Sequence, residues 1–264
     1  MTLAAIAFLK TFAPAVSFAI LFLAERARPA VPAPRGDGRL LRNASLWLSM
    51  AVASPLAGMP LTAFAATHAF WLRPDGAPTL FWFAADLVIL DCWTYFAHRA
   101  YHRIPMMWRL HAPHHLDEHL DTTSAGRFHP LEILISLAIK MAAIVALGIP
   151  VVAVILFEVV LNVTSMFNHS NASMPASLDR VLRLIVVTPD MHRVHHSILR
   201  RETDSNFGFN LPWWDRLFGT YRAQPEAGHT AMTIGIPMFR DPGELRIDRL
   251  LTQPFRNDTA SRAD

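Results

Sequence analysis

The stretch LEILISLAIKMAAIVALGIPVVAVILFEVVLNVTSMFN, residues 131–168, is almost entirely apolar. It is too long for one straight membrane crossing, because a helix spans the bilayer core with about 20 residues. Its one interruption is Gly-Ile-Pro at 148–150, and glycine and proline favour turns. The stretch therefore predicts a helical hairpin whose two arms enter and leave a membrane on the same side.

Three more apolar runs precede this block, at residues 3–24, 44–72 and 79–98. Over the whole chain 52% of the residues are hydrophobic and only 17% are charged, which excludes an ordinary soluble domain. The first run lacks a basic flank and a cleavage site, so we expect a retained anchor. The predicted fold class is all-α: a polytopic membrane helical bundle of about three spans plus the hairpin.

The charge pattern predicts the orientation of this bundle. Segment 25–42 contains five arginines and three prolines, and the positive-inside rule places such a loop in the cytoplasm. Two crossings then bring 98–129 to the cytoplasmic side, and the hairpin returns His169 there. The net charge of +3 needs no nucleic-acid partner. Abundant Ala and Arg with few Lys are typical of a bacterial inner-membrane protein.

Histidines gather on both sides of the hairpin. HAPHH at 111–115 and HRVHH at 192–196 repeat one order, and segments 98–102, 128–130 and 167–171 contribute four more histidines. Residues at i, i+3 and i+4 share a helix face, so neighbouring rings point the same way. Thr-Pro-Asp at 188–190 predicts a helix start, and Pro113 predicts that the helix bearing His114 begins after His111. The candidate metal ligands are His98, His102, His111, His114, His115, His129, His169, His192, His195 and His196.

Ten imidazoles are more than one zinc ion uses. Two ions with about five ligands each would keep an open position, which suits a redox-active ion that binds O₂, and imidazole suits iron. The single cysteine, Cys92, excludes an internal disulfide and an iron–sulfur cluster. The carboxylate-rich di-iron motif, the metalloprotease motif, the hydrolase elbow and the nucleotide-binding glycine motifs are absent from the sequence.

Polar residues inside two apolar runs share a helix face with the histidines at the ends of those runs. A carboxylate in such a place can accept the second ring N–H of a metal-bound imidazole. We expect these polar residues to orient the metal ligands, and Glu158 is alternatively a direct ligand. We expect no catalytic side chain other than the metal ligands. They are Asp91, Tyr95, Glu158 and Asn162. Three other histidines, His68, His119 and His229, are expected to be interfacial or hydrogen-bonded.

With these motifs the chain resembles the fatty acid hydroxylase / sterol desaturase superfamily of integral-membrane di-iron enzymes. DCWTYFAHRAYH (91–102), HAPHH, FHPLE (128–132) and TPDMHRVHH (188–196) match its ordered histidine boxes. NFGFNLPWWDRLFGTY (206–221) matches its ending. The similarity covers about residues 91–221.

The resemblance implies a membrane domain with a cytosolic cap that holds two iron ions through histidine, with O₂ as co-substrate. It implies hydroxylation or desaturation of an apolar lipid, such as a sterol, fatty acyl, carotenoid or ether lipid. Electrons would come from a separate ferredoxin, cytochrome or reductase. Eight histidines match ligand positions. His169 fits a box in which some members have two histidines, so the ligand total is nine or ten, depending on His129.

We therefore expect a single integral-membrane catalytic domain over residues 1–264. Its parts are the N-terminal spans (1–97), a cytosolic histidine-rich segment (98–130), the hairpin (131–168), a second cytosolic histidine-rich cap (169–222) and a tail (223–264). Within the cap we expect Asn206, Gly208, Trp213, Trp214 and Asp215 to have structural roles, with Asp215 accepting from Arg216 or a ligand histidine.

Two other classes of function stay open. A metal transporter or metal-binding membrane protein places its ligands near the membrane midplane on broken helices, whereas these boxes lie at helix ends. A membrane zinc hydrolase would need fewer histidines. A spectroscopically silent zinc site without O₂ uptake would favour the hydrolase.

Overall fold

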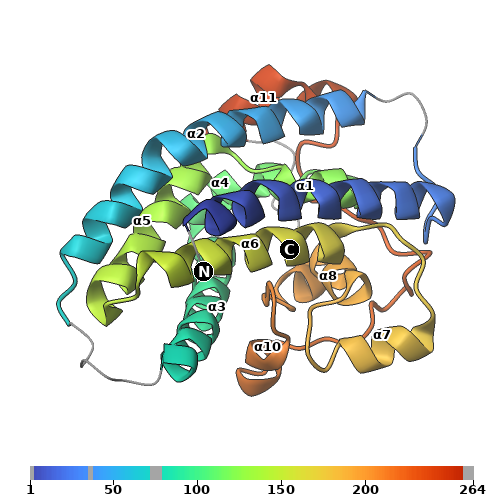
Figure 1. Ribbon diagram of the computed structural model, residues 1–264. Helices are drawn as coiled ribbons and strands as arrows, with labels where there is room; N and C mark the ends of the chain where they lie inside the picture. The colour runs from blue at the N-terminus through green and yellow to red at the C-terminus, as the bar shows by residue number, and fades with distance from the viewer. Residues whose placement is uncertain (1–2, 35–37, 72–78, 258–264) are drawn as a thin grey trace.

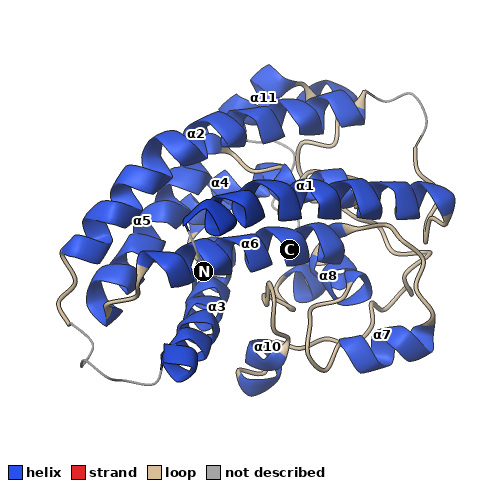
Figure 2. Ribbon diagram, in the orientation of Figure 1, coloured by secondary structure: helices blue, strands red, loops and turns tan. Residues whose placement is uncertain are grey.

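The computed structural model describes residues 3–34, 38–71 and 79–257. In these residues the chain forms helices and two isolated β-bridges but no β-sheet (Figure 2). In Figure 1 the short helices at 176–182, 189–195 and 213–217 gather at the lower right as a cap, while the short helix at 247–252 lies at the top beside the long helix at 39–67. The predicted all-α membrane bundle is confirmed.

The long helices correspond to the apolar runs. They are α1 (Leu3–Ala27), α2 (Arg39–Thr67), α3 (Thr79–Arg103), α5 (Pro130–Leu147) and α6 (Val151–His169). The shorter helices are α4 (Pro105–His115), α7 (Ala176–Leu182), α8 (Pro189–His195), α9 (Arg200–Thr203), α10 (Trp213–Leu217) and α11 (Ile247–Thr252), with 3₁₀ turns η1 (Thr122–Gly126), η2 (Pro242–Leu245) and η3 (Gln253–Phe255).

Four stretches of the described residues are long and apolar enough to cross a membrane: Phe8–Ala27, Leu80–Arg103, Pro130–Leu147 and Val151–His169. The predicted second span, 44–72, falls on α2, which is not among these four and packs along α5. Helix α2 also begins earlier than the apolar run, at Arg39. We treat the chain as an integral membrane protein.

The predicted hairpin is confirmed, and Gly148 makes its turn. This residue follows α5 with a positive φ of 62° and donates its N–H to Ile144 O at 2.9 Å. A side chain there would be strained and would collide with the carbonyl oxygen of Trp71, 2.1 Å from the position of a Cβ atom. Pro150 then precedes α6. The turn is held by an apolar core in which Ile144 and Phe157 are fully buried.

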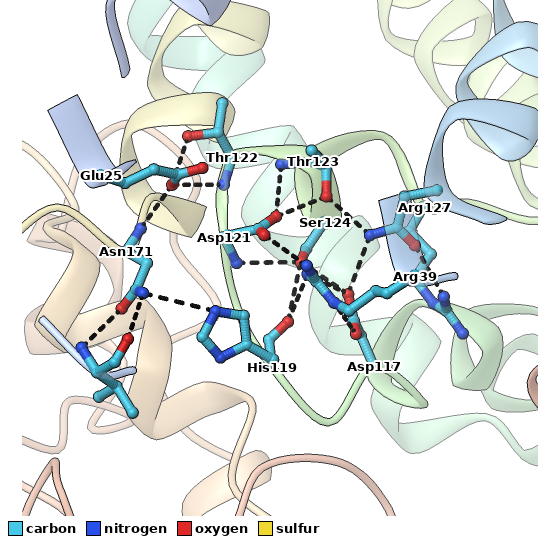
Figure 3. Close-up of polar contacts among 12 residues, drawn as sticks. Glu25, Arg39, Asp117, His119, Asp121, Thr122, Thr123, Ser124, Arg127 and Asn171 are labelled. Atoms are coloured by element: carbon cyan, nitrogen blue, oxygen red, sulfur yellow. Dashed lines mark hydrogen bonds and ion pairs between the residues drawn. The ribbon is translucent and has the colours of Figure 1, made fainter. Parts of the chain in front are cut away.

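A buried network, here called the polar clamp, ties α2 to the segment that follows α4 (Figure 3). The Arg39 guanidinium donates to both carboxylate oxygens of Asp117, at 2.6 and 2.7 Å, and to the backbone oxygen of His119 at 2.6 Å. It also pairs with Asp121. Burial alone would raise the pKa of Asp117, but the charge of Arg39 holds it well below its usual range.

The polar clamp also reaches α1 and the end of α6. One oxygen of the buried Glu25 carboxylate accepts from the backbone N–H of Thr122 and from that of Asn171, each at 3.0 Å. Arg193 donates to the Asn171 side chain at 3.0 Å. The clamp therefore joins the segments next to His115, His169 and His192.

Candidate metal centre

Nine of the ten predicted ligands lie in two adjacent groups, and all nine are buried. The first group takes two histidines from α3, two from α4 and one from α8: His98, His102, His111, His115 and His195. The second group takes its histidines from α4, α6 and α8, or from the residue after α8: His114, His169, His192 and His196. Within each group the ligand atoms lie within 4.8 Å of one another.

The two repeats of His-x-x-His-His serve the groups reciprocally. In the first repeat the outer histidines, His111 and His115, belong to the first group, and the middle one belongs to the second. In the second repeat His192 and His196 belong to the second group, and His195 belongs to the first. Around the helix axis, residue i+4 is rotated by about 40° from residue i, whereas residue i+3 is rotated by about 60° in the opposite direction. Each repeat can therefore bridge two sites.

Local sequence positions both repeats. The predicted start of α8 is confirmed, because Thr188 caps the helix by accepting from Met191 N–H and Pro189 is its first residue. The expectation that a helix starts only after His111 is wrong, because α4 runs from Pro105 to His115 through Pro113. Pro113 has no N–H to donate to the carbonyl of Arg109, so α4 lacks this one hydrogen bond, but the helix continues for two residues beyond it.

Backbone carbonyls and a carboxylate fix the orientation of several rings. His98 Nδ1 donates to Phe207 O at 2.8 Å, and His195 Nδ1 donates to Ser205 O at 2.7 Å. His111 Nδ1 donates a hydrogen bond to a carboxylate oxygen of Glu132, 2.6 Å away. In a neutral imidazole whose Nδ1 carries the proton, Nε2 presents a lone pair. These rings are therefore fixed in the tautomer in which Nε2 can bind a metal.

The distances between ring nitrogens fit a metal ion in each group. His98 Nε2 lies 3.2 Å from His111 Nε2, although both nitrogens present lone pairs that repel each other without a cation between them. In the second group His169 Nε2 lies 3.2 Å from His114 Nε2 and 3.1 Å from His192 Nε2. Metal–nitrogen bonds of about 2.1 Å place ligands at right angles about 3.0 Å apart.

Several buried ring nitrogens have no hydrogen-bond partner in the described chain, among them Nε2 of His102 and of His195. Such atoms are costly unless they bind something. The groups adjoin, because the rings of His115 and His196 stack with centroids 4.4 Å apart. The residues therefore fit two neighbouring metal ions.

The six clustered histidines outside the membrane-spanning segments have lowered pKa values, which favours the neutral form that binds metal. Burial lowers the pKa of His111 to about 3. Burial, followed by the neighbouring imidazoles, lowers the pKa of five others well below the usual value: His114, His115, His192, His195 and His196.

His129 lies in neither group. Its Nδ1 accepts from Leu131 N–H at 3.1 Å and so caps α5, while Nε2 donates to Leu251 O at 3.1 Å. Both nitrogens of this ring are therefore used in holding α5 and α11.

The four polar residues expected to orient ligands contact other parts of the protein instead of the histidine rings. Asp91 accepts from the side chains of Asn210 and Trp214, at 2.8 and 2.7 Å, and Tyr95 bonds to Thr220 at 2.8 Å. Both residues thus act on segment 206–221, which supplies the carbonyl that orients His98, instead of touching a ligand ring.

Glu158 and Asn162 belong to the hairpin. Glu158 pairs with Lys140 at 2.9 Å and with Lys10 at 3.3 Å, and Asn162 donates to the Glu158 backbone oxygen at 2.7 Å. Glu158 and His169 share a face of α6, as their spacing predicts. At about 1.5 Å per residue, however, Glu158 lies roughly 16 Å along α6 from His169. Its carboxylate cannot reach that ring.

Two carboxylates near the ligands were not assigned by the sequence analysis. Glu132 contacts the His111 ring. The feature of the sequence that could have identified it is its position as an acidic residue in the first turn of an apolar helix. Asp204 lies 3.6 Å from His102 Nδ1, and its side chain is 20% exposed. Asp215 accepts from Phe207 N–H and Gly208 N–H, both at 2.8 Å, so it has a structural role but not through a histidine or Arg216.

Comparison with known proteins follows this geometry. The family model described as "Fatty acid hydroxylase" matches residues 82–220, just over half of the chain, and this range contains all nine clustered histidines. The ornithine lipid hydroxylase OlsE of Rhizobium tropici is 34% identical over 165 residues, which are 62% of this chain and 48% of that protein. Alkylglycerol monooxygenase of Homo sapiens is 31% identical over 150 residues, 55% of this chain and 31% of that protein.

A third relative is the very-long-chain aldehyde decarbonylase GL1-1 of Oryza sativa subsp. indica, 33% identical over 139 residues, 49% of this chain and 22% of that protein. The matched region thus spans less than half the length of each of these curated relatives. No solved structure matches the chain.

Proposed function

Because this chain belongs to the fatty acid hydroxylase family, we propose that it is a membrane oxidoreductase that hydroxylates or desaturates a lipid with O₂ and two histidine-bound iron ions. The observation that supports this most strongly is the pair of adjoining, buried groups of neutral imidazoles. A hydrolase with a single zinc ion holds it with three protein ligands, and a transporter places its ligands near the membrane midplane on broken helices, so neither matches two adjoining groups of histidines at helix ends.

We assign five ligands to the first ion and four to the second, as the groups divide them. His129 is left out, because binding a metal would cost its contacts with Leu131 and Leu251. Bound iron would supply O₂ activation and the removal of hydrogen from an unactivated C–H bond. The protein holds the rings of His98, His111 and His195 in the metal-binding tautomer and keeps bulk water away from the buried rings.

The substrate proposed is a lipid with a long apolar chain that enters from the bilayer. The described residues include four apolar helices that could border lipid. The names of the relatives specify an ornithine lipid, an alkylglycerol and a very-long-chain aldehyde. One oxygen atom of O₂ enters the lipid in hydroxylation, and the electrons of a separate donor reduce the other to water.

We place segments 98–130 and 169–222 on the cytoplasmic side of a bacterial inner membrane, with the centre at that face. The basic loop 25–42 supports this orientation. A ferredoxin, cytochrome or reductase in the cytoplasm could then reach the centre.

The test is oxygen transfer from isotopically labelled O₂. Purified protein, loaded with ferrous iron and supplied with a reductant, is incubated with a bacterial lipid extract, and the products are identified by mass spectrometry. Labelled oxygen in a lipid, or a new double bond, is expected. His192→Ala should abolish the product, whereas His68→Ala, which changes an exposed histidine outside both groups, should not. Unchanged lipids with tightly held zinc would contradict the proposal.

A further inference from the structure

Large apolar side chains remain exposed on the cap, although the cap lies outside the four candidate spans. They lie on α7, on the turn after it and on α10. Their exposed fractions run from 38% at Phe218 to 69% at Leu217. We call the set the foot surface: Val181, Leu184, Ile185, Trp213, Leu217 and Phe218.

The two parts of the foot surface are bound together. Trp213 donates its indole N–H to Leu184 O at 2.8 Å, and Arg216 donates to Arg183 O at 2.8 Å. The exposed side chains therefore belong to one surface and not to two separate loops. Single exposed apolar residues are ordinary on a soluble protein, but a contiguous group marks an interaction site.

The foot surface continues into the lipid-facing side of α3. The Phe218 ring lies 4.9 Å from the ring of Phe96 and 5.5 Å from that of Tyr95, measured between centroids. Phe96 is 45% exposed and lies in the candidate span Leu80–Arg103. Figure 1 shows α10 at the edge of the cap on the side of α3. The bilayer that surrounds α3 would therefore meet α10 directly.

Helix α10 presents its apolar side chains outward because its one acidic residue, Asp215, is held in the interior of the cap. Asp215 is fully buried, and its two oxygens accept from Phe207 N–H and Gly208 N–H. Gly208 must lack a side chain, because a Cβ there would lie 2.9 Å from an Asp215 oxygen. This arrangement holds Trp213 and Leu217 toward the exterior.

The charges of this region suit an anionic membrane. Among residues 176–186 and 212–219, the two acids, Asp179 and Asp215, are buried, whereas Arg180 and Arg216 are exposed. Apolar side chains, a tryptophan and flanking arginines are the composition of a segment that lies in the headgroup region. An anionic lipid surface attracts such cations. A soluble protein partner would not explain the continuity with α3.

We propose that the foot surface is inserted into the membrane interface, against anionic phospholipids of the leaflet next to the metal centre. It anchors the cap at the bilayer beside α3. This inference concerns membrane contact and does not depend on the reaction catalysed.

The test places a nitroxide spin label on the foot surface of the full chain in lipid nanodiscs. In a Cys92→Ser background, Leu217→Cys carries the label, with Leu184→Cys as a second site in case the first variant fails to fold. Arg200→Cys is the control, because Arg200 is 89% exposed on α9 of the same cap. Collision with O₂, which dissolves in lipid, is compared with collision with a water-soluble nickel chelate.

The expected ratio of O₂ to chelate collisions is roughly fivefold or more above the control, since acyl chains exclude ionic solutes. Arg180→Gln with Arg216→Gln should lower this ratio in discs containing phosphatidylglycerol, but not in discs of phosphatidylcholine alone. Chelate access equal to the control at both sites would overturn the proposal. Burial that appears only as more protein is added would also overturn it, because a second copy would then cover the surface.

Discussion

The polar clamp and the metal centre are neighbouring buried clusters of polar side chains, yet their bonding is opposite. In the clamp, Arg39 meets two carboxylates and a carbonyl, so opposite charges satisfy each other. In the centre, rings of one kind face each other, and Nε2 of His195 has no partner within the described chain. Buried charges that pair with opposite charges, as around Arg39, indicate a structural role, whereas buried rings that leave lone pairs facing each other indicate a ligand site.

The comparison predicts different losses for the two clusters. Removing a member of the metal centre should remove the metal and the activity while the fold remains. Removing a member of the clamp should destabilise the protein by the same amount whether or not metal is present.

The largest effect is expected at the centre itself. His111→Ala removes a ring whose Nε2 lies 3.2 Å from those of both His98 and His115, so the first ion would lose one of its five proposed ligands. Activity should fall by more than about a hundredfold, beyond the loss typical of residues that only support a ligand. Iron content and O₂ uptake measure this. His129→Ala, which removes an imidazole outside both groups, should keep its iron; equal loss in both variants would contradict the ligand assignment.

Next comes the clamp. Arg39→Met leaves Asp117 and Asp121 buried without their cation and should lower the free energy of unfolding by about 3–5 kcal/mol. The loss should be the same with and without bound metal, which thermal unfolding in detergent measures. Arg200→Met, which breaks an exposed pair with Asp204, should cost no more than about 1 kcal/mol. An Arg39 variant as stable as its parent would show that the clamp is dispensable.

Lowering the pH should reduce the stability of the folded protein, because the histidines of the metal centre are held in their neutral form. The pKa of His111 falls from 6.5 to about 3 on folding, so below pH 6.5 the unfolded chain binds more protons than the folded one. Stability is then full above pH 6.5 and decreases as the pH falls toward about 3. At pH 5.5 the expected loss is about 1.4 kcal/mol for each such histidine.

Unfolding of the metal-free protein, measured from pH 7.5 to pH 5, checks this sign. The same titration of the iron-loaded protein should release iron, since protons compete for Nε2. Greater stability at pH 5 than at pH 7.5 would mean that these rings are charged in the folded chain.

A smaller effect is expected from the carboxylate behind the ligand. Glu132→Gln keeps the shape of the side chain but weakens its hold on the His111 N–H, so metal affinity should fall about 10–100-fold. Competition with a chelator measures the affinity. Glu158→Gln is the matched control, because Glu158 pairs with lysines and not with a ligand; a change of equal size there would contradict the role given to Glu132.

Local sequence patterns predicted the parts of the fold that local physics decides. The hairpin followed from apolar length and the turn at 148–150, and the start of α8 followed from Thr188 and Pro189. The repeated helical spacing also indicated that the nine clustered histidines would lie together. Resemblance to a family added the chemistry that spacing alone left open.

What the sequence left out depends on contacts between distant segments. The Arg39–Asp117 pair joins residues 78 positions apart, and no periodicity links them. The division of each repeat between two groups depends on how α4 and α8 face each other. Glu158 had the right helix face but the wrong height along α6, which a pattern of faces does not measure.

The most direct test of the central claim is the number of irons per chain. The protein is purified in detergent, stripped of metal, loaded anaerobically with ferrous iron and freed of excess, and its metal is counted by mass spectrometry. Two irons per chain, falling to one or fewer in His195→Ala, are predicted, with O₂ consumed when reductant is added. A single tightly held ion, zinc that iron cannot displace, or a His195 variant that still binds two irons would contradict the account.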